Sequence, residues 1–530
     1  MPATSATPAQ PTRPALALNM PFLAFAPLDV WYRLLFRPRA HIPARYLPRV
    51  IAGVIVSLVV TVLTLPERLL VGLWLRLRQK KQPGPVVILG YYRSGTTHLQ
   101  FLMSRDPNLY SPRWTQTLSP QGFLVSWSLL NYFLLPFFPD KRPQDNAAFG
   151  TDIPAEDDFA LANGDLVSSL IGRHVLPEHR DFYDRFHNLQ QLTPEEYARW
   201  AACQRSFVRK IGLLAGQARV LLKTPSHTAR VEDLMKLFAD SDGVRFIHIS
   251  RKPDSVFRSN VGLHRVLNGM YHLQEPLPEE EIERRIVDEY RATEDAYLEA
   301  RSKVPAGHRA ELRLEDLLAD PVGQMKRLYQ ELGLPYTEEF EQRLLEYLDA
   351  TKNYEQNAHR EKDSEATRRL LEPVEPFRTT FGHDRPAVAK QEVPLPRSLQ
   401  PTERRHRLLT AAGKAVLAAG LSLVPWMGLT ALVGLRLDGL VWLAGIAIGM
   451  TAITTARRGT TALGLWCALV TLLTGLTGSL LTTCLIAPTM PGDLTALLQE
   501  TWRTIEIIPV PFWMLLGTVG AYRLGTRSWI

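Results

Sequence analysis

The sequence predicts an α/β domain, with a P-loop-like parallel sheet flanked by helices, joined to an α-helical transmembrane bundle. Three observations support this prediction. Short β-branched runs alternate with amphipathic stretches over residues 82–400, a glycine-bounded loop follows the first run, and residues 408–530 combine few acids with long apolar runs. At 530 residues the chain also exceeds the size at which one hydrophobic core stops growing, so we expect at least two structural units.

Three apolar runs rich in β-branched residues are the clearest strands. They cover Val86–Leu89, Arg219–Leu222 and Val244–Ser250. A helical pattern at His227–Ala239 separates the last two, which predicts a βαβ unit with two parallel strands in one sheet. We assign this sheet to a domain spanning residues 82–400.

Residues 408–530 have the composition of a membrane domain. Their apolar stretches predict four transmembrane helices at Ala415–Leu435, Leu440–Thr455, Thr461–Ala487 and Ile507–Tyr522. Arginines concentrate at alternate boundaries of these stretches, so the positive-inside rule predicts an integral membrane protein whose 82–400 domain faces the cytoplasm. The alternative is a buried soluble bundle, which should show polar faces at helical period.

The N-terminal 81 residues divide into two parts. We expect residues 1–45 to be disordered or membrane-proximal, because their start is rich in Pro, Ala and Thr. Residues 46–81 contain the apolar run Val50–Leu65, which is short for a span and is interrupted at Pro66. Basic residues on both flanks favour an apolar hairpin or a membrane-associated helix, with a buried helical pair as the alternative.

Charge and cysteine content limit the function classes. The chain has 61 Lys and Arg against 53 Asp and Glu, a net charge of +8, but no basic stripe interleaved with aromatic residues, so we expect no nucleic-acid partner. Such a charge also suits membrane surfaces and anionic phosphate donors. Cys203, Cys467 and Cys484 are too few for a disulfide framework or a Cys-based zinc site, and the His and acidic residues show no ligand spacing, so we expect no metal.

The turn after the first strand has the features of a phosphate cradle. Gly90 and Gly95 bound the loop Gly-Tyr-Tyr-Arg-Ser-Gly, and a helical pattern runs from Thr96 to Arg105. The G-x4-G spacing lets backbone N–H groups curl around a phosphate at the positive end of that helix. Thr96 stands where a Walker motif has lysine, and the cation of the loop is Arg93, which argues against ordinary ATP or GTP hydrolysis.

The segment Tyr92-Arg-Ser-Gly-Thr-Thr97 resembles the 5'-phosphosulfate loop of the sulfotransferase superfamily. Its bacterial-type and tyrosylprotein-sulfotransferase branches commonly carry Arg where this chain has Arg93. The resemblance implies a sulfotransferase fold and the donor 3'-phosphoadenosine 5'-phosphosulfate (PAPS). It also implies that the donor is bound by Arg93, Ser94, Gly95, Thr96, Thr97 and His98.

The superfamily pairs this loop with a strand that ends in Arg and a Ser eight residues later. Here Arg251 follows Val244–Ser250, and Ser259 lies on the next helical stretch. A guanidinium can hold a phosphate with two hydrogen bonds, and the hydroxyl adds another donor. The resemblance therefore assigns the 3'-phosphate of PAPS to Arg251 and Ser259, and it covers roughly residues 85–335.

Candidate catalytic groups lie in two further segments. Lys223, in the family-like segment Leu221-Leu-Lys-Thr-Pro-Ser-His227, ends a strand at the sheet edge where open α/β sheets bind ligands. Together with Arg93 it suits neutralisation of the charge that develops as a sulfuryl group is transferred. Glu156, in the acidic triplet of residues 156–158, is the candidate general base, with His98 and His174 as weaker alternatives.

These features predict a PAPS-dependent sulfotransferase. We expect it to transfer a sulfuryl group to a hydroxyl or amine of a membrane-proximal acceptor, which is a lipid, a glycan or a small molecule, and we expect the lipid bilayer to be a partner. A P-loop kinase-like enzyme and a nonenzymatic membrane scaffold with the same fold are the alternatives.

Overall fold

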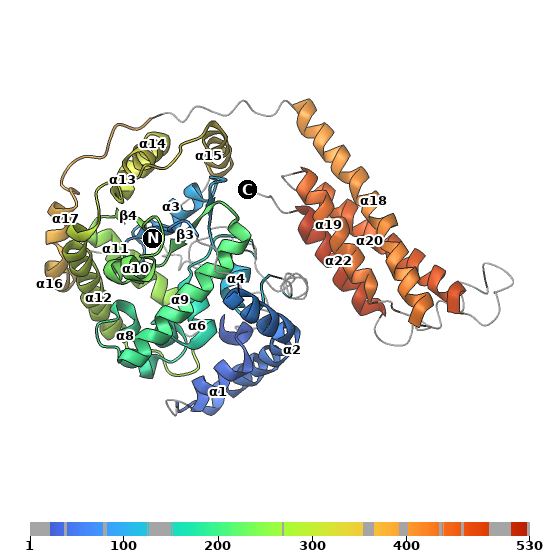
Figure 1. Ribbon diagram of the computed structural model, residues 1–530, viewed down its shortest axis with the longest axis horizontal. Coiled ribbons are helices and arrows are strands. Elements are labelled where there is room, and N and C mark those ends of the chain that lie inside the picture. Colours follow the sequence, from blue (N-terminus) through green and yellow to red (C-terminus); the bar gives the residue numbers. More distant parts are fainter. Residues whose placement is uncertain are drawn as a thin grey trace, which may run out of the picture. The chain divides into compact units, whose positions relative to one another are not determined.

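A computed structural model describes residues 22–36, 40–77, 82–124, 126, 150, 152–267, 270–352, 365–391, 401–433, 437, 439–456, 460–486, 495 and 510–526. These residues form two compact units (Figure 1). The described residues up to Gln391 make the first unit, and those from Pro401 onward make the second.

A five-stranded sheet forms the centre of the first unit, in the order β2-β3-β1-β4-β5. The strands are β1 Val86–Leu89, β2 Leu109–Tyr110, β3 Arg219–Lys223, β4 Arg245–Ser250 and β5 Arg309–Arg313. All neighbours pair in parallel, and Val86 of β1 lies between Leu221 of β3 and Arg245 of β4. The predicted strands and the parallel sheet flanked by helices are confirmed.

The sheet is buried between helices, which explains its continuous apolar strands. All four residues of β1 are buried, and Ile88, Leu221 and Ile247 share one core with Leu99. The α-helices of this unit are α1 Leu28–Phe36, α2 Leu47–Leu77, α3 Thr96–Met103, α4 Trp114–Leu118, α6 Asp158–Asp165, α7 Leu170–His174, α8 Arg180–Asn188, α9 Pro194–Ala215, α10 Val231–Leu237, α11 Pro253–Leu267, α12 Glu279–Ala300, α13 Leu314–Ala319, α14 Pro321–Glu331, α15 Glu338–Thr351, α16 Glu365–Leu371 and α17 Pro376–Thr380. Short 3-10 turns are η1 Phe22–Phe25, η2 Ala44–Tyr46, η4 Pro177–His179, η5 Pro225–Ala229, η6 Arg301–Lys303 and η7 Glu372–Val374.

The helix predicted at His227–Ala239 is divided in the structure. Pro225 begins the 3-10 turn η5, and the α-helix α10 starts only at Val231 and ends at Leu237. The side chain of His227 bonds to Asp157 instead of lying on a helix surface. This tertiary contact explains why the helical pattern overestimated the length of the helix.

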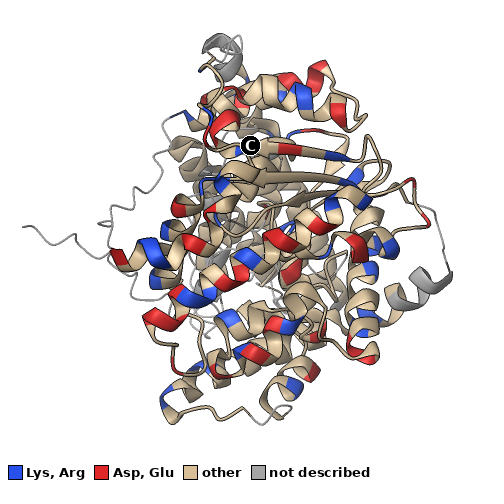
Figure 2. Ribbon diagram, turned by 90° about the vertical axis from the view of Figure 1, so that its left-hand side faces the viewer, with Lys and Arg blue, Asp and Glu red and all other residues tan. Residues whose placement is uncertain are grey.

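The helices of the first unit have a mixed charge. Figure 2 shows basic and acidic residues interspersed along them, and neighbouring turns carry ion pairs such as Arg284–Asp288 at 2.9 Å. Each pair of opposite charges at this spacing stabilises an exposed helix by about 0.2–0.5 kcal/mol. These pairs indicate a solvated helical surface.

Residues Phe22–Phe36 are folded, so disorder, one of the two alternatives expected for residues 1–45, does not apply to this part, and its proximity to a membrane stays a prediction. Leu23, Val30 and Trp31 are buried in the first unit. The Trp31 indole nitrogen Nε1 donates a hydrogen bond to Leu23 O at 2.8 Å. Apolar packing thus orders this segment, although the Pro-, Ala- and Thr-rich residues before it gave no sign of a fold. Residues 1–21 and 37–39 lie outside the described part.

α2 is one helix from Leu47 to Leu77, so of the two expected alternatives the hairpin is not formed. Pro66 lies inside it and removes one backbone hydrogen bond. Thr64 and Glu67, on either side of Pro66, are buried against the first unit. These contacts hold both halves of the helix in line. The predicted membrane association of this helix stays a prediction.

The described part of the second unit contains four helices, at the positions of the four predicted apolar stretches. They are α18 Pro401–Val433, α19 Leu440–Ala456, α20 Thr461–Ile486 and α22 Val510–Thr526. Their core contains many small residues, including Ala411, Ala415, Ala419, Ala452 and Ala521, which permit close helix packing. Threonine hydroxyls bond within their own helices, as Thr471 Oγ1 does to Cys467 O at 2.8 Å.

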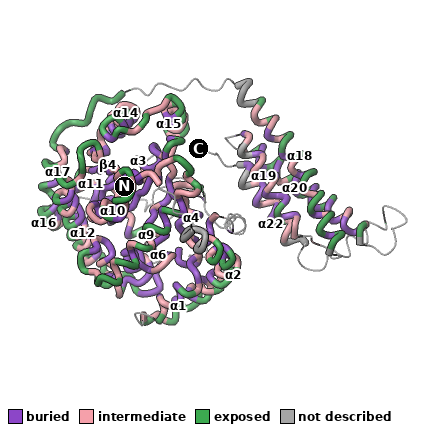
Figure 3. The backbone as a smooth tube through the Cα atoms, in the orientation of Figure 1, coloured by how far each residue is buried: buried purple, intermediate pink, exposed green. Residues whose placement is uncertain are grey.

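Three described segments are long and apolar enough to cross a membrane. They are Ala44–Val71, His406–Leu432 and Thr461–Leu485. α19 and α22 have 17 residues each, the lower end of the spanning range. Figure 3 shows exposed segments along α18 and α20, where Leu432 and Leu465 are 85% and 60% exposed.

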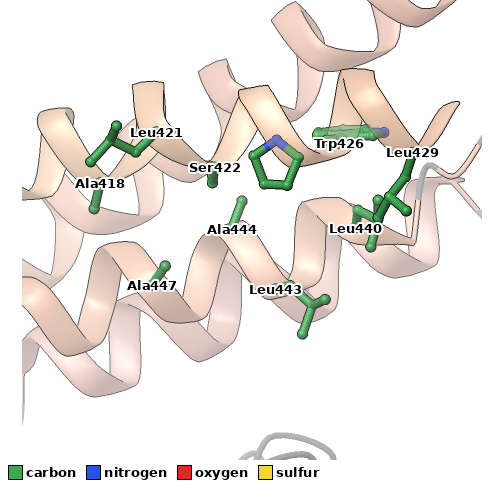
Figure 4. Close-up of a pocket in the computed structure, with 10 residues that line it drawn as sticks. Ala418, Leu421, Ser422, Trp426, Leu429, Leu440, Leu443, Ala444 and Ala447 are labelled. Carbon is green, nitrogen blue, oxygen red and sulfur yellow. The ribbon is translucent and has the colours of Figure 1, made fainter. Parts of the chain in front are cut away.

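A hollow of about 450 Å³ lies between α18 and α19 (Figure 4). Leu421 and Trp426 line it from α18, and Ala444 and Ala447 line it from α19. Its lining is almost entirely apolar, with Ser422 as the one hydroxyl among its residues in the described part of the chain. The hollow therefore offers no group for acid–base chemistry.

Candidate active site

The loop after β1 is held in a conformation that glycine makes possible. Gly90, Arg93 and Gly95 have positive φ angles of 135°, 69° and 104°. A Cβ on Gly90 would lie 2.3 Å from Ile249 O, which leaves no room for a side chain. α3 starts directly after Gly95, so its first backbone N–H groups have no helical acceptor and are available to an anion.

The predicted site residues meet where the sheet order reverses. β1 lies between β3 and β4. β2 and β3, which come earlier in the chain, lie on one side of β1, and β4 and β5 lie on the other. Ligands of open α/β sheets bind at such a switch point, beyond the carboxyl ends of the strands. Gly90, Lys223 and Arg251 stand at those three strand ends.

Arg93 connects the loop to the second predicted anion-binding element. Its Nε donates to Ser259 Oγ at 3.0 Å, and its carbonyl accepts a hydrogen bond from Arg251 Nη1 at 3.3 Å. Burial lowers the pKa of Arg251, the charge of Arg93 adds to this effect, and Glu315 opposes it. Two guanidinium groups that repel each other in this way favour an anion between them.

Lys223 lies between the loop and the acidic triplet. Its Nζ is 2.6 Å from Glu156 Oε1 and 3.3 Å from Thr97 Oγ1. The Lys223 side chain is 2% exposed and the Glu156 side chain 19%. The structure therefore brings together a cation, a carboxylate with access to solvent and a loop hydroxyl.

A short backbone ladder positions Glu156. Arg113 and Pro154 form an antiparallel bridge, and Ala155 N donates to Pro112 O at 2.8 Å. Gln100 Nε2, from α3, donates to Ala155 O at 3.1 Å. The segment before Glu156 is thus tied to the helix that follows the loop.

The other two acids of the triplet have structural partners. Asp157 Oδ2 is 2.7 Å from His227 Nε2, and Asp157 Oδ1 accepts from Thr224 Oγ1 at 3.0 Å. Burial alone would raise the pKa of Asp157, but the charge and hydrogen bond of His227 hold it below its usual range. Asp158 pairs with the buried Arg230 at 3.0 Å. Glu156 is the member of the triplet that contacts Lys223.

The two histidine alternatives are neutral near pH 7. Burial lowers the pKa of His98, in the first turn of α3, to about 4. Burial also lowers the pKa of His174 well below its usual value, and the neighbouring charge of Arg173 adds to this. A neutral imidazole retains a lone pair for hydrogen bonding, but so low a pKa makes it a weak base.

Some residues of the site were not singled out from the sequence. Thr228 Oγ1 accepts a hydrogen bond from Gly90 N at 2.7 Å and fixes the entry to the loop.

Ser94, which was predicted to bind the donor, has a buried Oγ with no hydrogen-bond partner among the described residues. Its orphaned hydroxyl is a polar group that a bound anion would satisfy.

A parallel sheet with a glycine-bounded anion loop at its switch point, and a second cationic element on the adjacent strand, defines a P-loop-like α/β protein. A sequence profile of the sulfotransferase family matches residues 85–338. The omega-hydroxy-beta-dihydromenaquinone-9 sulfotransferases Stf3 of Mycobacterium bovis and Mycobacterium tuberculosis are 30% identical to this chain over 335 residues, which is 62% of this chain and 83% of each relative. The chain belongs to the sulfotransferase family.

Two solved mycobacterial proteins are similar to this chain. Sulfotransferase STF9 from Mycobacterium avium has 20% identity and a TM-score of 0.48, covering 69% of this chain and 97% of that protein. Sulfotransferase STF1 from Mycobacterium tuberculosis H37Rv has 18% identity and a TM-score of 0.46, covering 65% and 90%. The family match, residues 85–338, includes neither α1 and α2 nor the second unit.

Proposed function

We propose that this chain transfers a sulfuryl group from PAPS to the hydroxyl of a lipidic acceptor at a membrane. The observation that carries the proposal is the position of Lys223, between Thr97 of the loop (3.3 Å) and Glu156 (2.6 Å). Family membership supports the sulfuryl transfer itself. The donor, the roles of individual residues and the acceptor are our inferences.

The residues around the loop fit a donor with two anionic ends. The left-handed backbone at Gly90 and Gly95 and the orphaned hydroxyl of Ser94 suit the phosphosulfate end. Arg251 and Ser259, which Arg93 contacts, suit the 3'-phosphate. When bound, PAPS supplies an activated sulfuryl group on a phosphate leaving group.

Two side chains carry the proposed chemistry. Lys223 stabilises negative charge on the oxygen from which the sulfuryl group departs, and its burial strengthens that interaction. Glu156 accepts the proton of the attacking hydroxyl, because its carboxylate is partly exposed and fixed beside Lys223. The two groups hold each other in position until the reactants bind.

A lipid with a hydroxyl group is the acceptor we favour. The relative Stf3 is named for an omega-hydroxy-beta-dihydromenaquinone-9 acceptor. Three helices long and apolar enough to cross a membrane support an acceptor located there. The arginines at alternate helix boundaries, such as Arg457 and Arg458, support a catalytic unit that faces the cytoplasm.

Binding of adenosine 3',5'-bisphosphate (PAP) and ATP to the full-length chain tests the donor assignment. We expect PAP to bind more tightly than ATP and Arg251→Ala to weaken PAP binding, while Arg284→Ala, at an exposed site on α12, leaves both affinities unchanged. Tighter ATP binding that is insensitive to Arg251→Ala would indicate a kinase. Binding of neither nucleotide would indicate a nonenzymatic scaffold.

A further inference from the structure

The polarity of α2 is inverted relative to that of a helix on a water-soluble protein. Its buried side repeats every three or four residues, at Val50, Gly53, Ser57, Val60, Thr64 and Glu67. Its outward side carries exposed apolar residues, at Ile51, Ile55, Leu58, Val59, Val62, Leu65, Leu69 and Leu70. A surface helix in water places its apolar stripe inward and its polar residues outward.

The inner side of α2 makes polar contacts with the first unit. Ser57 Oγ donates to Ala26 O at 2.7 Å, and Thr61 Oγ1 accepts from Leu28 N at 2.9 Å. The indole of Trp31 lies against Gly53, where a Cβ would be 2.5 Å from the ring. These contacts fix the helix to α1 and to Ala26, which precedes α1.

Glu67 makes further contacts on the inner side of α2. Its carboxylate accepts hydrogen bonds from Leu124 N at 2.9 Å and Ser126 N at 2.8 Å. Lys210 Nζ, from α9, lies 3.7 Å from Glu67 Oε1. A buried carboxylate held in this way keeps the C-terminal half of α2 docked on the catalytic unit.

The outer side of α2 is a long apolar surface, with the partly exposed Arg68 near its C-terminal end. Its eight apolar side chains are 47% to 69% exposed, and the sequence has no charged residue between Arg49 and Glu67. The distance from Ile51 to Leu70 along the helix is about 30 Å. Figure 3 shows exposed segments along α2. An apolar surface of this size is unusual on a protein surrounded by water and marks a site of contact with a membrane or another apolar partner.

α1 extends this surface and basic residues border it. Tyr32 and Phe36 of α1 are 60% and 62% exposed. Together with Val54 of α2 they line a largely apolar hollow of about 470 Å³, whose lining also includes Asp29. Arg45, which pairs with Glu275, and Arg68, which pairs with Asp29, lie near the two ends, at the level where a bilayer has its anionic headgroups and where aromatic side chains are enriched.

The packing of the inner side determines how α2 meets a bilayer. A helix crossing the membrane would carry everything docked on its inner side into the hydrocarbon, including the turn of α9 at Lys210 and the exposed Arg205 and Arg209 beside it. Charged side chains in hydrocarbon are unfavourable. A helix lying in the plane of the interface immerses only its outer side and leaves α9 in water.

We propose that α2, together with α1, forms an in-plane membrane-binding surface, although its length would suffice for a span. Its outer side lies among the acyl chains and its polar inner side holds the catalytic unit. This surface places the active site beside the bilayer by a contact separate from α18–α22.

Spin-label depth measurements on the full-length chain in lipid vesicles test this orientation. One label is introduced at a time, by Ile51→Cys, Ile55→Cys, Leu58→Cys, Val62→Cys, Leu65→Cys or Leu69→Cys, with the three native cysteines replaced by alanine. Glu299→Cys, at a side chain that is 78% exposed on α12, is the water-accessible reference. We expect all six labels to be accessible to oxygen at one common depth of about 5–10 Å.

Three results would overturn the proposal. A graded depth, spread over about 27 Å between residues 51 and 69, would indicate a span. Shielding of the labels from both oxygen and water-soluble relaxants would indicate that other helices or a second copy cover the surface. Accessibility like that of the Glu299→Cys reference would indicate contact with water alone.

A photocrosslinking experiment keeps the native cysteines and covers the case in which the labelled chains do not fold. p-Benzoylphenylalanine in place of Leu58 should yield lipid adducts in vesicles. The same residue in place of Val60, which is buried, should yield adducts within the first unit. Adducts of the Leu58 probe with α18–α22 or with a second chain, in place of lipid, would contradict the proposal.

Discussion

The ammonium group of Lys223 lies 2.6 Å from the carboxylate of Glu156, although the two residues belong to distant parts of the sequence. Lys223 ends a central strand, whereas Glu156 precedes α6. A buried lysine needs such a partner to remain charged. The pair joins the proposed leaving-group cation to the proposed base.

Glu156→Gln should lower turnover by about 100-fold or more at saturating PAPS, because the amide cannot accept the acceptor's proton. PAP affinity should stay the same, since Glu156 is assigned no contact with the nucleotide. Steady-state kinetics and calorimetry with PAP separate the two effects. Asp152→Asn, at a nearby exposed carboxylate, is the matched control and should leave turnover unchanged. Turnover of Glu156→Gln within about threefold of wild type would remove Glu156 from the mechanism.

Lys223→Ala should lower kcat by about 100- to 1000-fold, because the charge on the departing oxygen loses its stabilising cation. Lys303→Ala, at an exposed lysine, should have no effect. The double variant Glu156→Gln/Lys223→Ala should lose much less than the product of the two single losses, since each residue positions the other. Fully multiplicative losses would show that the contact at 2.6 Å has no role in catalysis.

Arg251→Ala should weaken PAP binding by about 1.5–3 kcal/mol, which is about 10- to 150-fold. AMP, which lacks the 3'-phosphate, should bind to the variant and to wild type about equally. Ser259→Ala should show the same selectivity for PAP with a smaller loss, because a neutral hydroxyl is replaced. Titration calorimetry with the two nucleotides measures both effects. Equal losses for PAP and AMP would place Arg251 elsewhere in the nucleotide site.

Asp157→Asn should destabilise the first unit most at neutral pH. The pKa of Asp157 in the folded chain lies below its unfolded value, so its contribution is present above about pH 4 and is lost as the pH falls further. The loss at pH 7 should be about 3–5 kcal/mol, because His227 loses its buried charged partner. Thermal unfolding at pH 7 and at about pH 3 should show a smaller difference from wild type at the lower pH. A difference that is constant with pH would contradict this role.

The sequence predicted that the glycine-bounded loop, Arg251 and Ser259 would meet at one edge of the sheet, because the signals for their positions are local. Gly90 and Gly95 flank a turn, and Arg251 and Ser259 lie at a fixed spacing after a strand. The carboxyl ends of parallel strands meet at one edge of the sheet. A segment that directly follows such a strand is therefore expected at that edge. For the same reason the contact of Arg93 with Ser259 follows from the fold class.

The remaining features depend on contacts between distant segments. The acidic triplet is typical of a solvated helix start, yet Asp157 and Asp158 are buried, because His227 and Arg230 reach them from another part of the chain. Pro66 predicted a break in α2, but burial of the residues on both sides keeps the helix continuous. Such tertiary contacts override local preferences, and a single sequence does not reveal them.

Transfer of ³⁵S from labelled PAPS, in membranes that supply the native acceptors, tests the central claim most directly. Membranes from cells expressing the wild-type chain should incorporate ³⁵S into the lipid extract, with one PAP formed for each sulfuryl group transferred. Membranes containing Lys223→Ala at the same level should show about 100-fold less incorporation. Equal labelling by both chains, or Lys223-dependent labelling from γ-³²P-ATP instead of PAPS, would contradict the account.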